Sequence, residues 1–140
     1  MAKVYIAARW VEREKMPEIA EELEVRGHSI THEWWKFEAL ESNPEKMKEF
    51  GQQDVMGVFK SDLVLLINSG KSEGKAVEQG LAIALGRPIV AVGKRGEHSQ
   101  NVFHYLEDYR WVENLEQAYE TIERIGRIIA PTTRSFRRGY

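Results

Sequence analysis

The sequence of 140 residues contains no cysteine, which excludes disulfides, cysteine-ligated zinc, iron–sulfur clusters and thiol catalysis. No apolar run approaches the roughly 20 residues that a membrane-spanning helix needs. The first residues lack the long apolar stretch of a secretory signal and are expected to form a strand. The net charge of −2 is too balanced for a dedicated nucleic-acid binder. These absences predict a cytoplasmic protein with neither a membrane nor a nucleic-acid polymer as its partner.

Common cofactor and metal signatures are also missing. The triplet Gly70-Lys71-Ser72 is similar to the end of a phosphate-binding P-loop, but that motif needs a glycine at position 65, where Leu65 stands. There is no G-x-G-x-x-G segment, and the four histidines lack the spacing that would place ligands on a common helix face. We therefore expect neither a cofactor nor a metal.

The composition that remains is typical of one folded domain. Hydrophobic residues make up 42% and charged residues 30% of the chain, as in ordinary soluble proteins. A chain of this length accommodates one hydrophobic core and no second independent one. We expect a single domain over residues 1–140, in which about residues 130–140 form a basic tail.

Apolar patterns predict strands that alternate with helices. The expected strands cover residues 3–8, 28–34, 62–68, 88–92 and 109–112. The expected helices end near residue 26, run from 44 to about 60, from about 75 to 85, and from 115 to about 128. Asn43 followed by Pro44 marks one helix start, Asn114 marks another, and Gly86 marks a stop.

This alternation predicts an α/β fold with a doubly wound, flavodoxin-like parallel sheet of five strands. Ligands of such sheets bind at the C-terminal ends of the strands, beside the point where the strand order reverses. In this plan the reversal lies between the first and third strands. Arg9 and Trp10 are therefore expected to face the segment 69–78.

Glu78 is the leading candidate for chemistry. It lies near the start of a helix that follows a central strand, where the partial positive charge of the helix N-terminus favours a carboxylate. An ionised carboxylate in a cleft can attack a carbon that carries developing positive charge, and the anomeric carbon of a sugar is the usual case. The alternative is that Glu78 belongs to a solvated helix face.

Asp54 is a candidate partner, because the helix that carries it precedes the same central strand. Two carboxyl groups in different environments can divide the roles of nucleophile and proton donor, and a leaving base needs a proton on a ring nitrogen. The alternative is an ordinary surface aspartate. Trp10, Trp34 and Trp35 lie near strand ends and could stack on a base, although we expect one of the adjacent pair to pack in the core.

Several segments resemble those of the nucleoside 2-deoxyribosyltransferase family, which includes related nucleoside 5′-monophosphate N-glycosidases. The segment Tyr5–Trp10 (YIAARW) is similar to the opening Y-x-x-A-x-W motif, and Asp54–Asp62 (DVMGVFKSD) is similar to a D-x-x-G-I-x-x-x-D junction. Gly74–Pro88 resembles the segment that carries the nucleophilic glutamate. Asn101 and the terminal Tyr140 resemble the late asparagine and carboxy-terminal tyrosine. The resemblance covers nearly the whole chain.

The resemblance implies a double displacement that retains configuration at the sugar. Glu78 would displace the base and form a glycosyl-enzyme, which a second base or water then discharges. Tyr5 would orient the Glu78 carboxylate, Asp54 would carry the proton to and from the base, and Trp10 would line the base pocket. The implied partners are a nucleoside or nucleotide and a free nucleobase.

The resemblance also implies a homo-oligomer with shared active sites. Asn101 and the carboxylate of Tyr140 would reach the sugar 5′ end of a neighbouring subunit's site.

Two departures from the transferase pattern concern the 5′ end of the substrate. Ser72 stands beside Gly74 where transferases tend to carry an acidic residue, and the monophosphate N-glycosidases carry serine for phosphate. Arg9 replaces a small residue and adds a cation. Both changes suit a phosphate.

Other features leave alternatives open. Asn101 resembles the nucleoside-using branch, and Arg9 could instead pair with Glu12 or Glu33. The leading hypothesis is a transferase that exchanges bases on 2′-deoxynucleosides. The alternatives are a hydrolase of nucleoside 5′-monophosphates and a non-catalytic nucleotide-binding module.

Overall fold

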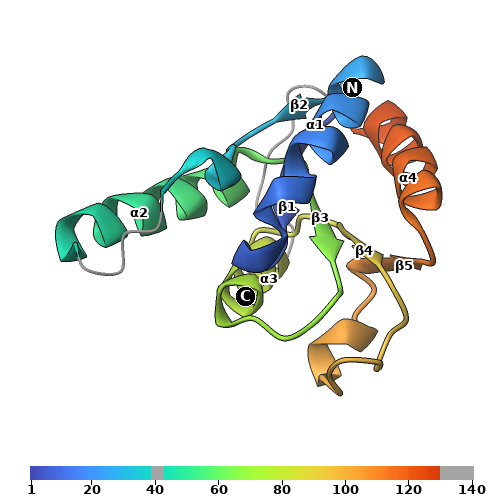
Figure 1. The fold of residues 1–140 in the computed structure, drawn as a ribbon. Coiled ribbons are helices and arrows are strands. Elements are labelled where there is room, and N and C mark those ends of the chain that lie inside the picture. Colours follow the sequence, from blue (N-terminus) through green and yellow to red (C-terminus); the bar gives the residue numbers. More distant parts are fainter. Residues whose placement is uncertain (39–42, 130–140) are drawn as a thin grey trace.

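The computed structural model describes residues 1–38 and 43–129 (Figure 1). The strands are β1 (Lys3–Ala7), β2 (Ser29–Ile30), β3 (Leu63–Ile67), β4 (Ile89–Val92) and β5 (Tyr109–Val112). The helices are α1 (Met16–Val25), α2 (Pro44–Lys60), α3 (Glu73–Ala84) and α4 (Leu115–Ile128). Three short 3-10 helices are η1 (Trp10–Lys15), η2 (Trp34–Lys36) and η3 (Val102–Tyr105). No described helix is both long and apolar enough to cross a membrane.

All strand pairs of the sheet are parallel, and the strand order is β2-β1-β3-β4-β5. The chain starts in β1, adds β2 on one side and then crosses to the other side for β3. The order therefore reverses between β1 and β3, which confirms the expected doubly wound, flavodoxin-like fold. The central strands are buried on both faces, as expected for continuous apolar runs such as LVLLI in β3.

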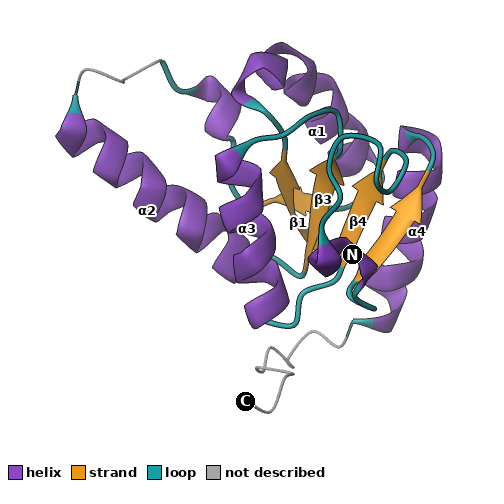
Figure 2. Cartoon of the chain, turned by 90° about the horizontal axis from the view of Figure 1, so that it is seen from below, coloured by secondary structure: helices purple, strands orange, loops and turns teal. Residues whose placement is uncertain are grey.

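Helices cover both faces of the sheet (Figures 1 and 2). α1 and α4 lie on one face, where the guanidinium of Arg26, just after α1, pairs with Glu116 and Glu123 of α4 at 3.1 Å and 2.9 Å. α2 and α3 pack together on the other face. The first half of α2 extends beyond the sheet (Figure 2). Glu78 and Asp54 are carried by this second pair of helices.

Local sequence signals account for the helix boundaries. Asn43 and Asn114 accept hydrogen bonds from the backbone N–H of the third residue after each, as N-cap residues do. Pro17 lies in the first turn of α1, where its missing N–H costs nothing. Gly86 follows α3 with a φ of 70°, a left-handed conformation that glycine adopts without strain. These boundaries match the predictions to within about two residues.

The second strand is shorter than the prediction of residues 28–34. Backbone N–H groups of Ser29 and Thr31 bond to carbonyls of Ala2 and Val4, but the next carbonyl of β1, that of Ile6, accepts the indole Nε1–H of Trp34 at 2.7 Å. A side-chain hydrogen bond thus replaces the next backbone hydrogen bond between β1 and β2. The strand ends there, and the short helix η2 follows. The 3-10 helices η1 and η3 were likewise not predicted.

Candidate active site

A cavity of about 400 Å³ opens at the C-terminal ends of β1 and β3. The loop after β1, the first turns of α3, one side of α2 and the turn η2 supply its walls. Its polar lining comes from Asp54, Ser72, Lys75 and Glu78. This is the place that the fold predicts for a ligand, and it brings together the two carboxylates that the sequence singled out.

Glu78 projects from the second turn of α3 and is anchored from beneath. The hydroxyl of Tyr5, a fully buried residue of β1, donates a short hydrogen bond to Glu78 Oε2. Tyr5 thereby fixes one carboxylate oxygen, while Glu78 still lines the cavity. The structure thus brings together two of the predicted site residues, Tyr5 and Glu78, in direct contact.

Opposing effects act on the pKa of Glu78. Burial raises its pKa to about 8, and the nearby charge of Asp54 acts in the same direction. The hydrogen bond from Tyr5 and the ammonium of Lys75 oppose the rise. Burial and the two carboxylates in turn raise the pKa of Tyr5, so its hydroxyl remains a donor. A carboxylate that is desolvated and yet held by one donor is well suited to attack an electrophilic carbon.

Asp54 reaches the cavity from the middle of α2. Its Oδ1 lies 3.1 Å from Nε2 of His32, and its side chain is 38% exposed, compared with 13% for His32. Asp54 is also close enough to the Tyr5 hydroxyl to raise that group's pKa. Asp54, Tyr5 and Glu78 therefore form one connected group in which two carboxyls have different surroundings.

A glycine on α2 allows this group to assemble. A Cβ at Gly57 would come within 2.9 Å of both the Cβ of His32 and the ring of Tyr5. Any other residue would push α2 away from β1 and carry Asp54 with it. The glycine in the segment that resembles D-x-x-G therefore has a packing reason: it sets how closely α2, which carries Asp54, approaches Tyr5 and His32.

Aromatic side chains make most of the apolar wall. Trp10 and Trp34 lie with ring centroids 6.2 Å apart, and Phe37 stacks on Phe50 at 4.0 Å. Trp34 and Trp35 are both buried, so the core role expected for one of the pair holds for each, and Trp34 also borders the cavity. Planar surfaces of this kind can bind a nucleobase by stacking.

The N-terminus of α3 forms the polar end of the cavity. Ser72 is the N-cap and accepts the backbone N–H of Lys75 at 3.3 Å, and Gly74 lines the cavity next to it. The ammonium of Lys75 is buried and donates to the carbonyls of Ile67 and Gly70 at 3.0 Å and 2.6 Å. Burial lowers the pKa of Lys75.

Arg9 lies outside this lining and follows the alternative in which it pairs with a neighbouring carboxylate. Its Nε is 3.3 Å from Glu12 Oε1, which also accepts the hydroxyl of Ser69 at 2.5 Å. Burial of Glu12 would raise the pKa of its carboxyl, but the hydrogen bonds from Ser69 and Arg9 outweigh burial and lower that pKa. The guanidinium covers Gly70, where a Cβ would lie only 2.8 Å away.

Asn101 lies apart from Glu78 within the chain. It borders a second cavity of about 330 Å³ on another side of α3, together with Gln79 and Tyr109, and its Oδ1 accepts the backbone N–H of Phe103 at 2.9 Å. Tyr140, like the rest of the tail from residue 130, lies outside the described residues.

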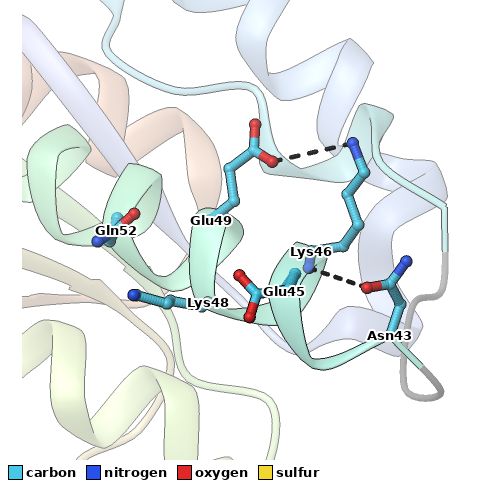
Figure 3. A pocket seen from close by; sticks show the side chains of 6 residues that line it. All are labelled: Asn43, Glu45, Lys46, Lys48, Glu49 and Gln52. Atoms are coloured by element: carbon cyan, nitrogen blue, oxygen red, sulfur yellow. Dashed lines mark hydrogen bonds and ion pairs between the residues drawn. The ribbon is translucent and has the colours of Figure 1, made fainter.

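A further hollow of about 350 Å³ lies on the first turns of α2 (Figure 3). Its side chains pair with one another: Asn43 caps Lys46, and the ammonium of Lys46 lies 3.8 Å from Glu49. None of the predicted site residues lines it, so it contributes nothing to this site.

Sequence reasoning missed His32 and Lys75. The position of His32 at the end of the second predicted strand could have indicated it, because that end meets the same sheet edge as Trp10. Lys75 precedes Glu78 by three residues and so shares its helix face. Within residues 1–38 and 43–129, no group of three or more His, Asp or Glu side chains is arranged to hold a metal ion.

No protein-family model matches this sequence, and no curated protein does. Similar folds occur in the CMP N-glycosidase BcmB of Clostridium botulinum, with a TM-score of 0.57 and 18% identity over 87% of this chain and 98% of that one. They also occur in the 2-deoxyribosyltransferase of Bacillus psychrosaccharolyticus, with a TM-score of 0.63 and 19% identity over 84% and 90%.

A third similar structure is DNA processing protein A of Helicobacter pylori, which binds single-stranded DNA. Its TM-score is 0.57, with 14% identity over 87% of this chain and 80% of that one. One fold thus serves different functions, as is common. The matches confirm the fold that the resemblance implied, and proteins of both implied kinds, a 2-deoxyribosyltransferase and an N-glycosidase, are among them.

Proposed function

We propose that this protein is an enzyme of the nucleoside 2-deoxyribosyltransferase kind that cleaves the N-glycosidic bond of a nucleoside or nucleotide. The observation that carries the proposal is the buried hydrogen bond from Tyr5 to Glu78, beside Asp54, in a cavity with aromatic walls. A module that only binds nucleotides needs no desolvated carboxylate with an anchoring donor, and this geometry therefore favours catalysis over the non-catalytic alternative.

In the proposed reaction Glu78 attacks the anomeric carbon as the base departs. The positive charge that develops on the sugar favours an ionised carboxylate, and the hydrogen bond from Tyr5 orients it. Asp54 supplies a proton to a ring nitrogen of the base, which leaves as a neutral molecule. A second base or water then attacks the glycosyl-enzyme, and Asp54 receives the proton back.

We favour transfer of a 2-deoxyribosyl group to a second base. The aromatic walls of the cavity, Trp10, Trp34, Phe37 and Phe50, suit a free base that waits for the glycosyl-enzyme. Stacked rings would also keep water from the anomeric carbon. Both effects would raise the share of transfer over hydrolysis.

Hydrolysis of a nucleoside 5′-monophosphate is the second candidate, and a specific observation favours it. Ser72, Gly74 and the buried cation of Lys75 gather at the N-terminus of α3, which is a favourable setting for an anion. Arg9 would assist only by leaving its ion pair with Glu12. Lys75 therefore takes the place of Arg9 as the main candidate cation.

One experiment separates these functions. The purified protein is incubated with 2′-deoxynucleosides and with their 5′-monophosphates, each with and without a second free base, and the products are separated. A new nucleoside indicates transfer, a free base without a new nucleoside indicates hydrolysis, and binding without turnover indicates a module. Calorimetry with each ligand reports the preference at the 5′ end. We place the reaction in the cytoplasm and expect no binding of single-stranded DNA.

We also propose a homo-oligomer with shared sites. Asn101 borders a different cavity from Glu78 within the chain, so it would serve a site only by facing the Glu78 of a neighbour. Mixing Glu78→Gln subunits with Asn101→Ala subunits should then restore about a quarter of wild-type activity in randomly paired dimers, because half of the pairs carry one intact site. No recovery in the mixture, or a fully active monomer in solution scattering, would contradict shared sites.

A further inference from the structure

His32 lies behind Asp54 as seen from the cavity. Its Nε2 is 3.1 Å from Asp54 Oδ1, whereas Asp54 borders the cavity and His32 does not. Both atoms are buried and have no other hydrogen-bond partner among the described residues. A proton on His32 Nε2 and a small turn of the imidazole would join them in a hydrogen bond that holds Asp54 Oδ1.

The surroundings of His32 keep its ring in this position. The side chain is 13% exposed, and its ring lies 5.2 Å from the ring of Phe37. Gly57 of α2 brings the helix backbone against the Cβ of His32 and the ring of Tyr5 at once. His32 thus lies between Phe37 and α2, with its Nε2 3.1 Å from the Asp54 carboxylate.

We propose that His32 is a positioning residue that orients Asp54 and stabilises the Asp54 carboxylate formed when the proton passes to the leaving base. The inference rests on the proposed function. His32 contacts neither the sugar nor the base in this arrangement; it acts through Asp54. It adds a fourth member to the group of Tyr5, Asp54 and Glu78.

In the proposed step Asp54 and Glu78 share one proton, and the reactive form is the one in which this proton lies on Asp54 Oδ2 and Glu78 is ionised. An oxygen of Glu78 forms a bond to the anomeric carbon while the carbon–nitrogen bond breaks, and its electron pair stays on the base. The proton of Asp54 Oδ2 moves to a ring nitrogen of the base. Asp54 becomes a carboxylate, and its negative charge favours a hydrogen bond from His32 Nε2 to Oδ1, because a charged acceptor binds a donor more strongly.

Substrates with different leaving bases distinguish this role of His32 from a packing role. A 2′-deoxynucleoside of 7-methylguanine already carries a positive charge on its base and leaves as a neutral molecule without a proton from the enzyme. Ordinary 2′-deoxyguanosine needs that proton. Damage to proton delivery slows only the second substrate, whereas damage to the cavity slows both.

The experiment compares His32→Phe, His32→Gln and His98→Gln on the two substrates. We expect His32→Phe to lower kcat on 2′-deoxyguanosine about 10- to 100-fold, part of the usual contribution of an acid–base group, and to change kcat on the 7-methyl substrate less than about 3-fold. Glutamine carries an amide N–H near the position of Nε2, so His32→Gln should recover much of the loss. His98→Gln, in a loop outside the site, should behave as wild type.

A double-mutant cycle with Asp54→Asn adds a second test. If His32 acts through Asp54, His32→Phe has little further effect on 2′-deoxyguanosine once Asp54 is replaced. Equal losses on both substrates, or fully additive effects, would overturn the inference and leave His32 with a packing role. A wild-type protein that cleaves neither 2′-deoxynucleosides nor their 5′-monophosphates, whatever the base, would instead refute the proposed function itself.

Discussion

Two neighbouring residues of α3, Glu78 and Gln79, border two different cavities of similar volume, about 400 Å³ and 330 Å³. On the Gln79 side the polar groups satisfy one another. Gln79 Oε1 accepts the hydroxyl of Tyr109 at 2.7 Å and lies 3.1 Å from Nε2 of His104, while Gln79 Nε2 donates to the carbonyl of Lys75 at 3.0 Å. This network contains no carboxylate, and Nδ1 of His104 is its one buried polar side-chain atom without a partner among the described residues.

On the Glu78 side the polar groups do not satisfy one another. Two carboxylates share one cavity, burial raises the pKa of Glu78 to about 8, and within the described part of the chain the Tyr5 hydroxyl is its one hydrogen-bond donor. The comparison shows that volume does not identify an active site. What distinguishes the two cavities is whether burial of the polar groups is compensated or is left available for a substrate.

The largest effect is expected at Glu78. Glu78→Gln preserves the shape of the side chain and removes the nucleophile, so kcat should fall at least about 1000-fold. Steady-state kinetics measures the loss, and circular dichroism checks the fold. A variant that keeps more than a few per cent of wild-type activity would reject Glu78 as the nucleophile.

Gly57→Ala should disturb the cavity of Glu78 through α2, which lines the cavity opposite α3. The added methyl meets His32 and Tyr5 at 2.9 Å, so we expect a loss of about 1–3 kcal/mol of stability and a fall in activity of about 10-fold or more. The matched control is Gly51→Ala on the same helix, where nothing lies within 4 Å of the new Cβ. It should raise stability by about 0.5–1 kcal/mol and leave activity unchanged. Equal behaviour of the two variants would contradict the packing role of Gly57.

The pH dependence tests the balance at Glu78. Because Glu78 must be ionised while the Asp54–Glu78 pair still holds one proton, kcat/KM should fall with rising pH through a midpoint near 8, the raised pKa of Glu78 at which the pair loses that proton. Tyr5→Phe removes a hydrogen bond that lowers this pKa, so the midpoint should move upward and kcat/KM at about pH 7 should fall about 10-fold. A pH profile that Tyr5→Phe leaves in place would contradict the anchoring role of Tyr5.

The same shift has a consequence for stability. Between the ordinary pKa of 4.5 and the folded value of about 8, the folded protein holds the proton of Glu78 more tightly than the unfolded chain does. Stability from this group is therefore full below about pH 4.5 and is lost as the pH rises to about 8. Urea unfolding of wild type and Glu78→Gln across this range should show a smaller decline in the variant.

The smallest effect on activity is expected at Gln79. Gln79→Ala leaves the Tyr109 hydroxyl and His104 without their shared partner, which should cost about 1–3 kcal/mol of stability. The kcat of the folded variant should stay within about twofold of wild type. A tenfold loss of kcat would show that the second cavity also serves the reaction and would end the contrast between the two sides.

The sequence was sufficient for features that depend on local signals. The apolar run of β3, the N-cap Asn43 and the stop at Gly86 each act within a few residues, and their predictions are confirmed. The pairing of β1 with β3 followed from the strand order of the flavodoxin-like plan, and it brings Tyr5 and Glu78 together.

Features that depend on distant partners were not predictable. The second strand ends early because an indole takes the carbonyl of Ile6, and sequence patterns do not show which side chain will reach a backbone group. His32 joined the site only because Gly57 allows α2 to approach it. Arg9 had two available partners, the substrate and a neighbouring carboxylate, and the choice of Glu12 depended on the position of Ser69.

The length of α2 separates Asp54 from the outer rim of the cavity. Gly57, where α2 touches the strands most closely, is the natural pivot, and Asp54 lies three residues from it, whereas Met47, at the outer rim of the cavity, lies ten residues away. At about 1.5 Å per residue these arms measure roughly 4.5 Å and 15 Å. A tilt of α2 about Gly57 would move Met47 about three times as far as Asp54, so the rim of the cavity would widen while Asp54 stayed nearly in place.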